Sequence, residues 1–209
     1  MGESRGAVRS NEAGAPLALH EHAMGNLAYI RDTMARAGSF TSVSGTGMIG
    51  AGVMGFLASM ASFVITVERD PWNWLLLWLG AAAAAITFSV LNIRAKALRT
   101  NQLLSGSAGR TFALAFLPGI IAGAVMTAAL VHAREWSILP GGWLTLYGAA
   151  VTAGGAFSVR PVPVMGAIIF MLGVACFAAP APWYPIFLAA GFGGAHLWFG
   201  LRIARQHGG

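Results

Sequence analysis

The stretch PWNWLLLWLGAAAAAITFSVLNI, residues 71–93, decides the fold class of this protein. It lies between Asp70 and Arg94 and contains no charged residue. A helix needs about 20 consecutive apolar residues to cross the hydrocarbon core of a bilayer, and this stretch is long enough. It therefore predicts a transmembrane helix and not the amphipathic helix of a soluble domain.

The whole chain shares the character of this stretch. Of its 209 residues, 56% are hydrophobic and only 10% are charged, whereas soluble domains carry about 25% charged residues. Its single cysteine, Cys176, excludes an internal disulfide framework and a cysteine-rich metal site. We expect no cleavable signal peptide, because residues 1–30 contain charges and no apolar run. A soluble domain, a disordered chain and a secreted disulfide scaffold are all excluded.

Charges and prolines divide the rest of the chain into further apolar runs. The longest charge-free run, between Arg160 and Arg202, is too long for one span. Pro180 and Pro182 divide it, because proline ends helices. The sequence thus predicts an all-α integral membrane protein, with a bundle of six transmembrane helices within residues 45–205. The expected helices cover about 47–67, 73–95, 111–132, 142–159, 162–179 and 184–204.

The basic residues predict the orientation of this bundle, since Lys and Arg accumulate in cytoplasmic segments. With the N-terminus inside, all of the 13 basic residues except Arg69 and Arg134 fall on the cytoplasmic side. We therefore expect a multi-pass inner-membrane protein with cytoplasmic N- and C-termini. The net charge of +6 is expected to set this topology and not to bind nucleic acid. Aromatic anchors are expected at the outer boundary, namely Trp72, Trp74, Trp136, Trp143, Trp183 and Tyr184.

The N-terminal segment has two parts. Residues 1–18 are polar, and we expect them to form a disordered cytoplasmic tail. Within residues 19–38, apolar side chains recur at three- or four-residue spacing, which predicts an amphipathic helix on the inner membrane surface. This helix is either a passive anchor or a docking arm for another membrane or cytoplasmic protein. The residues expected to dock to the membrane or a partner are Leu27, Ile30, Arg31, Met34 and Arg36.

Glycine occurs 28 times, well above the usual share of about 7%. Small residues let membrane helices approach closely, so that van der Waals contact holds them together. We expect the glycine stripes to pack the bundle internally, and a homo-oligomer is the alternative use of one stripe. The glycines expected at helix contacts are Gly47, Gly55, Gly119, Gly123, Gly148, Gly191 and Gly194.

No Asp, Glu, Lys or Arg lies at the centre of an expected span, which argues against a proton pump or a carrier of charged substrates. His196 is the one titratable side chain deep in an expected helix. It is a weak candidate for binding haem or a metal, because no second histidine is expected at its depth. A neutral histidine hydrogen-bonded to a neighbouring helix is the simpler interpretation. We therefore expect no cofactor, no metal and no catalytic residue.

The expected loops are too short to contain a soluble catalytic domain, so the sequence does not predict an enzyme. Short loops, the lack of buried charge and the amphipathic arm favour a non-catalytic subunit or regulatory partner of a membrane complex. The alternative is a small facilitator or transporter of a neutral or hydrophobic solute. Its path would need polar side chains at mid-membrane, and the candidates are Thr127, Thr145, Thr152 and His196.

Three stretches of the chain carry a resemblance to known sequences. They are LAYIRDTM (27–34) with SFT (39–41), GGAFSVR (154–160) continuing to PVMG (163–166), and AGFGGAH (190–196) with the tail from Arg202 to Gly209. Together they resemble a family of small multi-span inner-membrane proteins of acidobacteria and related bacteria. The resemblance covers most of residues 27–209 and implies a bacterial inner-membrane location but no particular activity.

Overall fold

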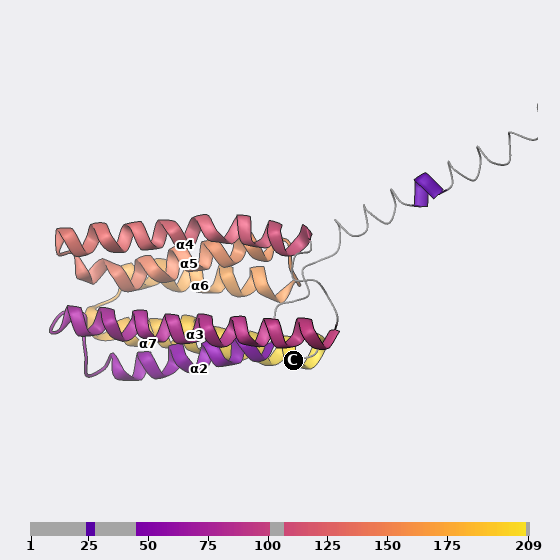
Figure 1. Cartoon of the computed structure of the whole chain (residues 1–209). Helices are drawn as coiled ribbons and strands as arrows, with labels where there is room; N and C mark the ends of the chain where they lie inside the picture. Colours follow the sequence, from indigo (N-terminus) through magenta and orange to yellow (C-terminus); the bar gives the residue numbers. More distant parts are fainter. Residues whose placement is uncertain (1–23, 28–44, 101–106, 208–209) are drawn as a thin grey trace, which may run out of the picture. The chain divides into compact units, whose positions relative to one another are not determined.

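The computed structural model describes residues 24–27, 45–100 and 107–207, and these are helical with short connections and no β-strand (Figure 1). The chain divides into two compact units, Met1–Gly38 and Ser39–Gly209. In the first unit the described residues 24–27 form one turn of helix whose side chains are exposed. All the longer helices that the structure describes lie in the second unit.

The helices of the second unit follow one another with few residues between them. The first three are α2 (Gly45–Ala61), α3 (Pro71–Thr100) and α4 (Ser107–Ala133). The short η1 (Trp136–Ile138) leads into α5 (Leu139–Gly155), and α6 (Pro161–Phe177) follows. The last segment runs through η2 (Ala181–Trp183), α7 (Tyr184–Leu188), the π-helix η3 (Ala189–Ala195) and α8 (His196–His207).

Three helical segments are long and apolar enough to cross a membrane, namely Pro71–Asn92, Gly109–Ala133 and Ala181–Gln206. The structure therefore confirms the prediction of an all-helical protein with segments that can cross a membrane. Helices α2, α5 and α6 have 17 residues each. At 1.5 Å per residue each is roughly 25 Å long, which is shorter than a typical hydrocarbon core of about 30 Å. The six spans therefore stay a prediction.

Two helix ends differ most from the sequence expectation. Helix α2 ends at Ala61, although the apolar run predicted a helix to about residue 67. The backbone N–H of Ser62 is shared between the carbonyls of Ala58 and Ser59, and this tightening starts the turns that follow. Helix α3 instead continues past Arg94 to Thr100. A charge marks the end of an apolar run, and a helix can extend beyond it into the polar headgroup region.

The helices pack in two groups (Figure 1). Helices α4, α5 and α6 form one group, in which α5 contacts both neighbours. Helix α2 forms the other group with α3 and α8. The π-helix η3 contacts both α2 and α6 and so connects the two groups.

Glycine permits the closest approaches. A Cβ atom added to Gly148 on α5 would lie 2.3 Å from the backbone nitrogen of Phe170, and one added to Gly166 on α6 would lie 2.5 Å from that of Thr152. Both distances are too short for any side chain, so α5 and α6 touch backbone to backbone. Similar short approaches occur at Gly55, Gly119 and Gly191, all expected at helix contacts.

The other expected packing glycines differ. Gly47 is buried, and its carbonyl oxygen accepts a hydrogen bond from Ser89 of α3. A Cβ atom on Gly123 would meet no atom of another described residue within 4 Å, and one on Gly194 would meet only the carbonyl of Ala189 in its own helix. The structure therefore leaves open space at the Cβ positions of Gly123 and Gly194. A GxxxG spacing gives the period of a helix face, but not how closely a neighbouring helix approaches each glycine.

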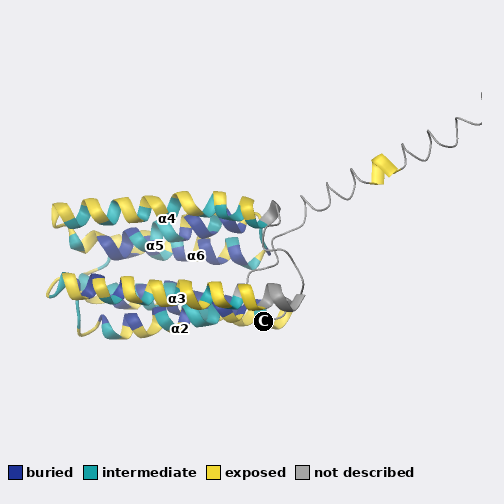
Figure 2. Cartoon of the chain, viewed as in Figure 1, coloured by how far each residue is buried: buried dark blue, intermediate teal, exposed yellow. Residues whose placement is uncertain are grey.

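Helix α4 has the most exposed surface of the long helices, and Figure 2 shows its residues as exposed or intermediate along its length. In the most apolar 18 residues of α4, no residue is buried. In the most apolar 18 residues of α3, only 17% are buried. Leu114, Ile121 and Val125 are more than half exposed. Such continuous apolar surface is unstable in water and suits contact with lipid chains or another membrane helix.

The contact between α5 and α6 can be tested with a matched pair of glycines. We expect Gly148→Ala to lower the free energy of unfolding by about 1–3 kcal/mol, because the new methyl group overpacks the contact. We expect Gly123→Ala to leave stability unchanged or raise it by up to ~1 kcal/mol, because alanine favours the helix and finds open space. Unfolding in mixed micelles measures both. Equal losses would contradict the backbone contact.

Candidate functional site

His196 begins α8 directly after the π-helix η3 and is buried, with 4% of its surface exposed. π-Helical segments are rare and often occur at functional sites. The sequence AAGFGGA of this one is rich in glycine, and Gly191 and Gly193 let it pack tightly against Leu144 and Phe56. The sequence analysis predicted an uninterrupted α-helix and missed this segment. The glycine density of the run was the available signal.

Both ring nitrogens of His196 have hydrogen-bond partners. Nδ1 lies 3.1 Å from the carbonyl oxygen of Gly191, and Nε2 lies 2.8 Å from the hydroxyl oxygen of Tyr147 on α5. A carbonyl oxygen only accepts, so this geometry assigns the proton of the neutral ring to Nδ1. Nε2 then accepts a hydrogen bond from the Tyr147 hydroxyl. The chain of donors ends at the Gly191 carbonyl, which cannot pass a proton on.

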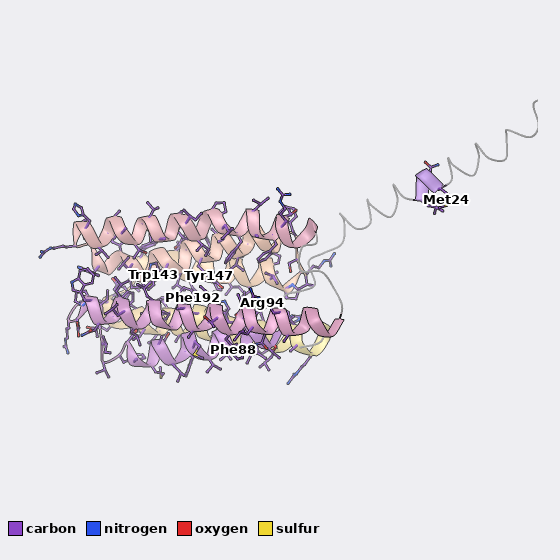
Figure 3. All side chains as sticks on the ribbon, in the orientation of Figure 1. Met24, Phe88, Arg94, Trp143, Tyr147 and Phe192 are labelled. Atoms are coloured by element: carbon purple, nitrogen blue, oxygen red, sulfur yellow. The ribbon has the colours of Figure 1, made fainter. Side chains whose placement is uncertain are left out.

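Other aromatic rings contact this pair, and the labelled Trp143, Tyr147 and Phe192 lie between the two helix groups (Figure 3). The ring centroid of Tyr147 lies 5.3 Å from that of Phe192 and 6.1 Å from that of Phe116. Phe192 lies 5.5 Å from Trp78 on α3, and Trp78 lies 6.3 Å from Trp143. The rings therefore link α4, α5, η3 and α3. We define the aromatic cluster as Trp74, Trp78, Phe116, Trp143, Tyr147 and Phe192.

The indole groups of this cluster are also paired. Trp78 Nε1 donates to the hydroxyl of Ser62 over 2.9 Å, and Trp143 Nε1 donates to the hydroxyl of Thr127 over 2.8 Å. Each hydroxyl in turn donates to a carbonyl of its own chain segment. Trp74, expected as an anchor at the membrane boundary, is instead buried and stacks on Trp143 at 5.0 Å. These tryptophans hold the bundle together internally.

The three threonines expected along a solute path all bond to the backbone of their own helices. Thr127, Thr145 and Thr152 each donate a hydrogen bond of 2.7–2.8 Å to the carbonyl four residues earlier in the same helix. Thr145 and Thr152 also lie against Gly173 and Gly166 of α6, where the helices are in closest contact. Among the described residues, no buried side-chain nitrogen or oxygen atom lacks a partner.

The described residues contain no group of three or more His, Cys, Asp or Glu side chains that could hold a metal ion. Cys176 is buried in α6. Of the residues expected to dock to the membrane or a partner, Leu27 is exposed by 60%. The others lie outside the described residues: Ile30, Arg31, Met34 and Arg36.

Comparison with known proteins finds no family model, no curated protein and no solved structure that matches this chain. Conclusions about its function therefore depend on its own residues.

The Tyr147–His196 pair can be tested with a double-mutant cycle. We expect Tyr147→Phe and His196→Leu each to lower the free energy of unfolding by about 1–3 kcal/mol, because each leaves a buried polar group without its partner. The double variant should lose less than the sum of the single losses, since both bonded groups are then gone. Thermal unfolding in detergent measures the cycle. Strictly additive losses would show that the two side chains do not interact.

Proposed function

We propose that this protein is a non-catalytic subunit or regulatory partner of a complex in the bacterial inner membrane. The observation that carries the proposal is the closed interior. The polar side chains at its centre bond to one another or to their own backbone, and aromatic rings fill the space between the two helix groups. What the protein recognises is therefore expected to bind on its lipid-facing helices, at the helix ends or on the N-terminal arm.

The closed interior disfavours the alternative, a facilitator for a neutral solute. Such a path needs polar groups that face a common channel and can exchange water for solute. Thr145 and Thr152 face the α5–α6 contact, and the hydroxyl of Thr127 accepts a hydrogen bond from the indole N–H of Trp143. His196 already uses both of its ring nitrogens. Opening a path between the helices would break the Tyr147–His196 and Trp143–Thr127 hydrogen bonds, at a cost of about 1–3 kcal/mol for each group left without a partner.

The outer faces of α3 and α4 support a partner in the membrane. Gly80 and Gly123 lie within the two spanning segments Pro71–Asn92 and Gly109–Ala133, and a Cβ atom on either would meet no described neighbour within 4 Å. Glycine within a helix costs about 1 kcal/mol relative to alanine. Gly80 is exposed, and glycines with open space at the Cβ position are consistent with the close approach of a helix from another chain.

We further propose that all six predicted segments span the membrane, with the N-terminal amphipathic helix on the inner surface and both termini cytoplasmic. The charges at the two ends of the described bundle support this orientation. Near the end where Trp72 contacts Trp136 lie three carboxylates, with Arg69 and Arg134 beside them. The opposite end has arginines and no described carboxylate, namely Arg94, Arg110, Arg160, Arg202 and Arg205.

The orientation predicts the outcome of reporter fusions. A fusion at residue 105 should be active only with a cytoplasmic reporter, and a fusion at residue 138 only with an external one, because basic residues are retained inside. Paired phosphatase and fluorescent-protein fusions measure this. A fusion at residue 180 is the control for the third outer loop. External signal at residue 105 would reverse the proposed topology.

The subunit proposal predicts both a partner and an absence of flux. Gentle native extraction at natural expression should yield a stoichiometric membrane or cytoplasmic partner, and deletion of residues 1–38 should reduce its recovery while the bundle stays folded. In proteoliposomes, light scattering should show no faster glycerol or urea entry than in protein-free vesicles. Solute entry well above that background would instead establish the facilitator. Full recovery of the partner after the deletion would exclude the arm as its docking site.

A further inference from the structure

An open groove of about 650 Å³ lies where the start of α6 meets the last turns of α8. Arg160 and Arg202 line it from the two sides, and Gln206 adds a polar group. Val164 and Phe199 contribute apolar surface one turn further along their helices. The volume is within the range of small-ligand sites. Cationic groups at one edge and apolar side chains beside them suit an amphiphile with an anionic head.

The charges around this groove are one-sided. The carboxylates in the described part of the chain are Glu68, Asp70 and Glu135, and they lie in the connections before α3 and α5, at the opposite end of the helices. None of them can pair with Arg160 or Arg202. Two guanidinium groups in one groove repel each other, and an anion between them relieves this repulsion. Arginine also matches the geometry of phosphate oxygens, because its N–H groups can donate two parallel hydrogen bonds.

The place of the groove along the chain points to a lipid. Arg202 and Gln206 end the apolar segment Ala181–Gln206, which is long enough to cross a membrane, and Phe199 lies one turn inside it. When this segment spans the bilayer, its end lies at the depth of the lipid headgroups. Basic pockets between transmembrane helices at this depth recognise anionic headgroups.

We propose that this groove binds one anionic phospholipid of the leaflet, with its phosphate between Arg160 and Arg202 and an acyl chain along Val164 and Phe199. The proposal rests on the membrane insertion proposed above. It is independent of whether the protein is a subunit or a facilitator.

Native mass spectrometry of the full chain in neutral detergent tests this binding. Dioleoylphosphatidylglycerol should bind at a stoichiometry of one and displace dioleoylphosphatidylcholine. Arg160→Gln and Arg202→Gln should each weaken its binding about fivefold, the effect expected for one basic side chain near an anionic lipid. The double variant should lose the preference for phosphatidylglycerol.

Arg205→Gln is the matched control. Arg205 is exposed on α8, as Arg202 is, and carries the same charge as Arg202, but it does not line the groove. We expect this variant to bind phosphatidylglycerol within twofold of the unaltered protein, where about fivefold is expected for each groove arginine. If it binds as weakly as Arg202→Gln, the attraction comes from the basic surface as a whole, and the proposed site is wrong.

A second binding measurement tells whether the groove recognises a lipid or a soluble phosphate. Glycerol phosphate should bind more than tenfold more weakly than phosphatidylglycerol, because it lacks the acyl chain. Val164 occupies an exposed position of the groove wall. The Val164→Gln variant should bind the lipid more weakly and bind glycerol phosphate with unchanged affinity. Equal affinity for both ligands would make this a phosphate site and overturn the lipid assignment.

Two further measurements keep misfolding and failed insertion distinct from loss of the site. Arg160→Lys and Arg202→Lys retain the charge, so they should keep part of the lipid preference if the variants are folded. Flotation of the unaltered protein with vesicles measures insertion by itself. Failure to float would overturn the proposed membrane location, whereas loss of selectivity in a protein that floats would overturn only the lipid site.

Discussion

Every polar group that enters the apolar interior of this protein must find its hydrogen-bond partner within the chain. Lipid offers none, and a buried group without a partner costs about 1–3 kcal/mol. The threonines of α4 and α5 meet this requirement by bonding to their own helices. The indoles of Trp78 and Trp143 meet it through hydroxyl groups. His196 needs two partners at once, and only the combination of Tyr147 with the Gly191 carbonyl supplies them.

The sizes of the interior side chains follow the distances between the helices. Where α5 and α6 run against each other, glycine brings the backbones into direct contact, and threonine side chains lie beside it. Where the two helix groups face each other, aromatic rings fill the distance instead. The π-helix η3 lies at the junction of these two arrangements. Its wider turn carries Phe192 into the aromatic cluster and His196 to Tyr147, so a glycine-rich segment holds the most specific contacts of the bundle.

The sequence predicted the helical content well, because charge-free runs and prolines report directly on which segments avoid water. It predicted helix ends less well, since Ser62 ends α2 through local hydrogen bonds and Arg94 does not end α3. A hydrogen bond from His196 to a neighbouring helix was expected from the sequence, but Tyr147 was not expected as the partner. Tyr147 is 49 residues away, and no local pattern connects the two. The burial of Trp74 was missed for a similar reason, because an aromatic residue near a helix start fits both a membrane boundary and a packed interior.

The closed interior limits where recognition can occur. A side chain that already hydrogen-bonds to a buried neighbour cannot bind a ligand without leaving that neighbour unpaired. The polar groups around Tyr147 and His196 therefore stabilise the fold and are not available to a ligand. The arginines at the start of α6 and near the end of α8 are different, because the described chain provides no carboxylate to pair with them. Gly80 of α3 and Gly123 of α4 likewise have open space where a side chain would lie. The unused capacity for interaction lies in groups suited to headgroups and to neighbouring helices, and this distribution supports the proposed binding role over the movement of a solute through the bundle.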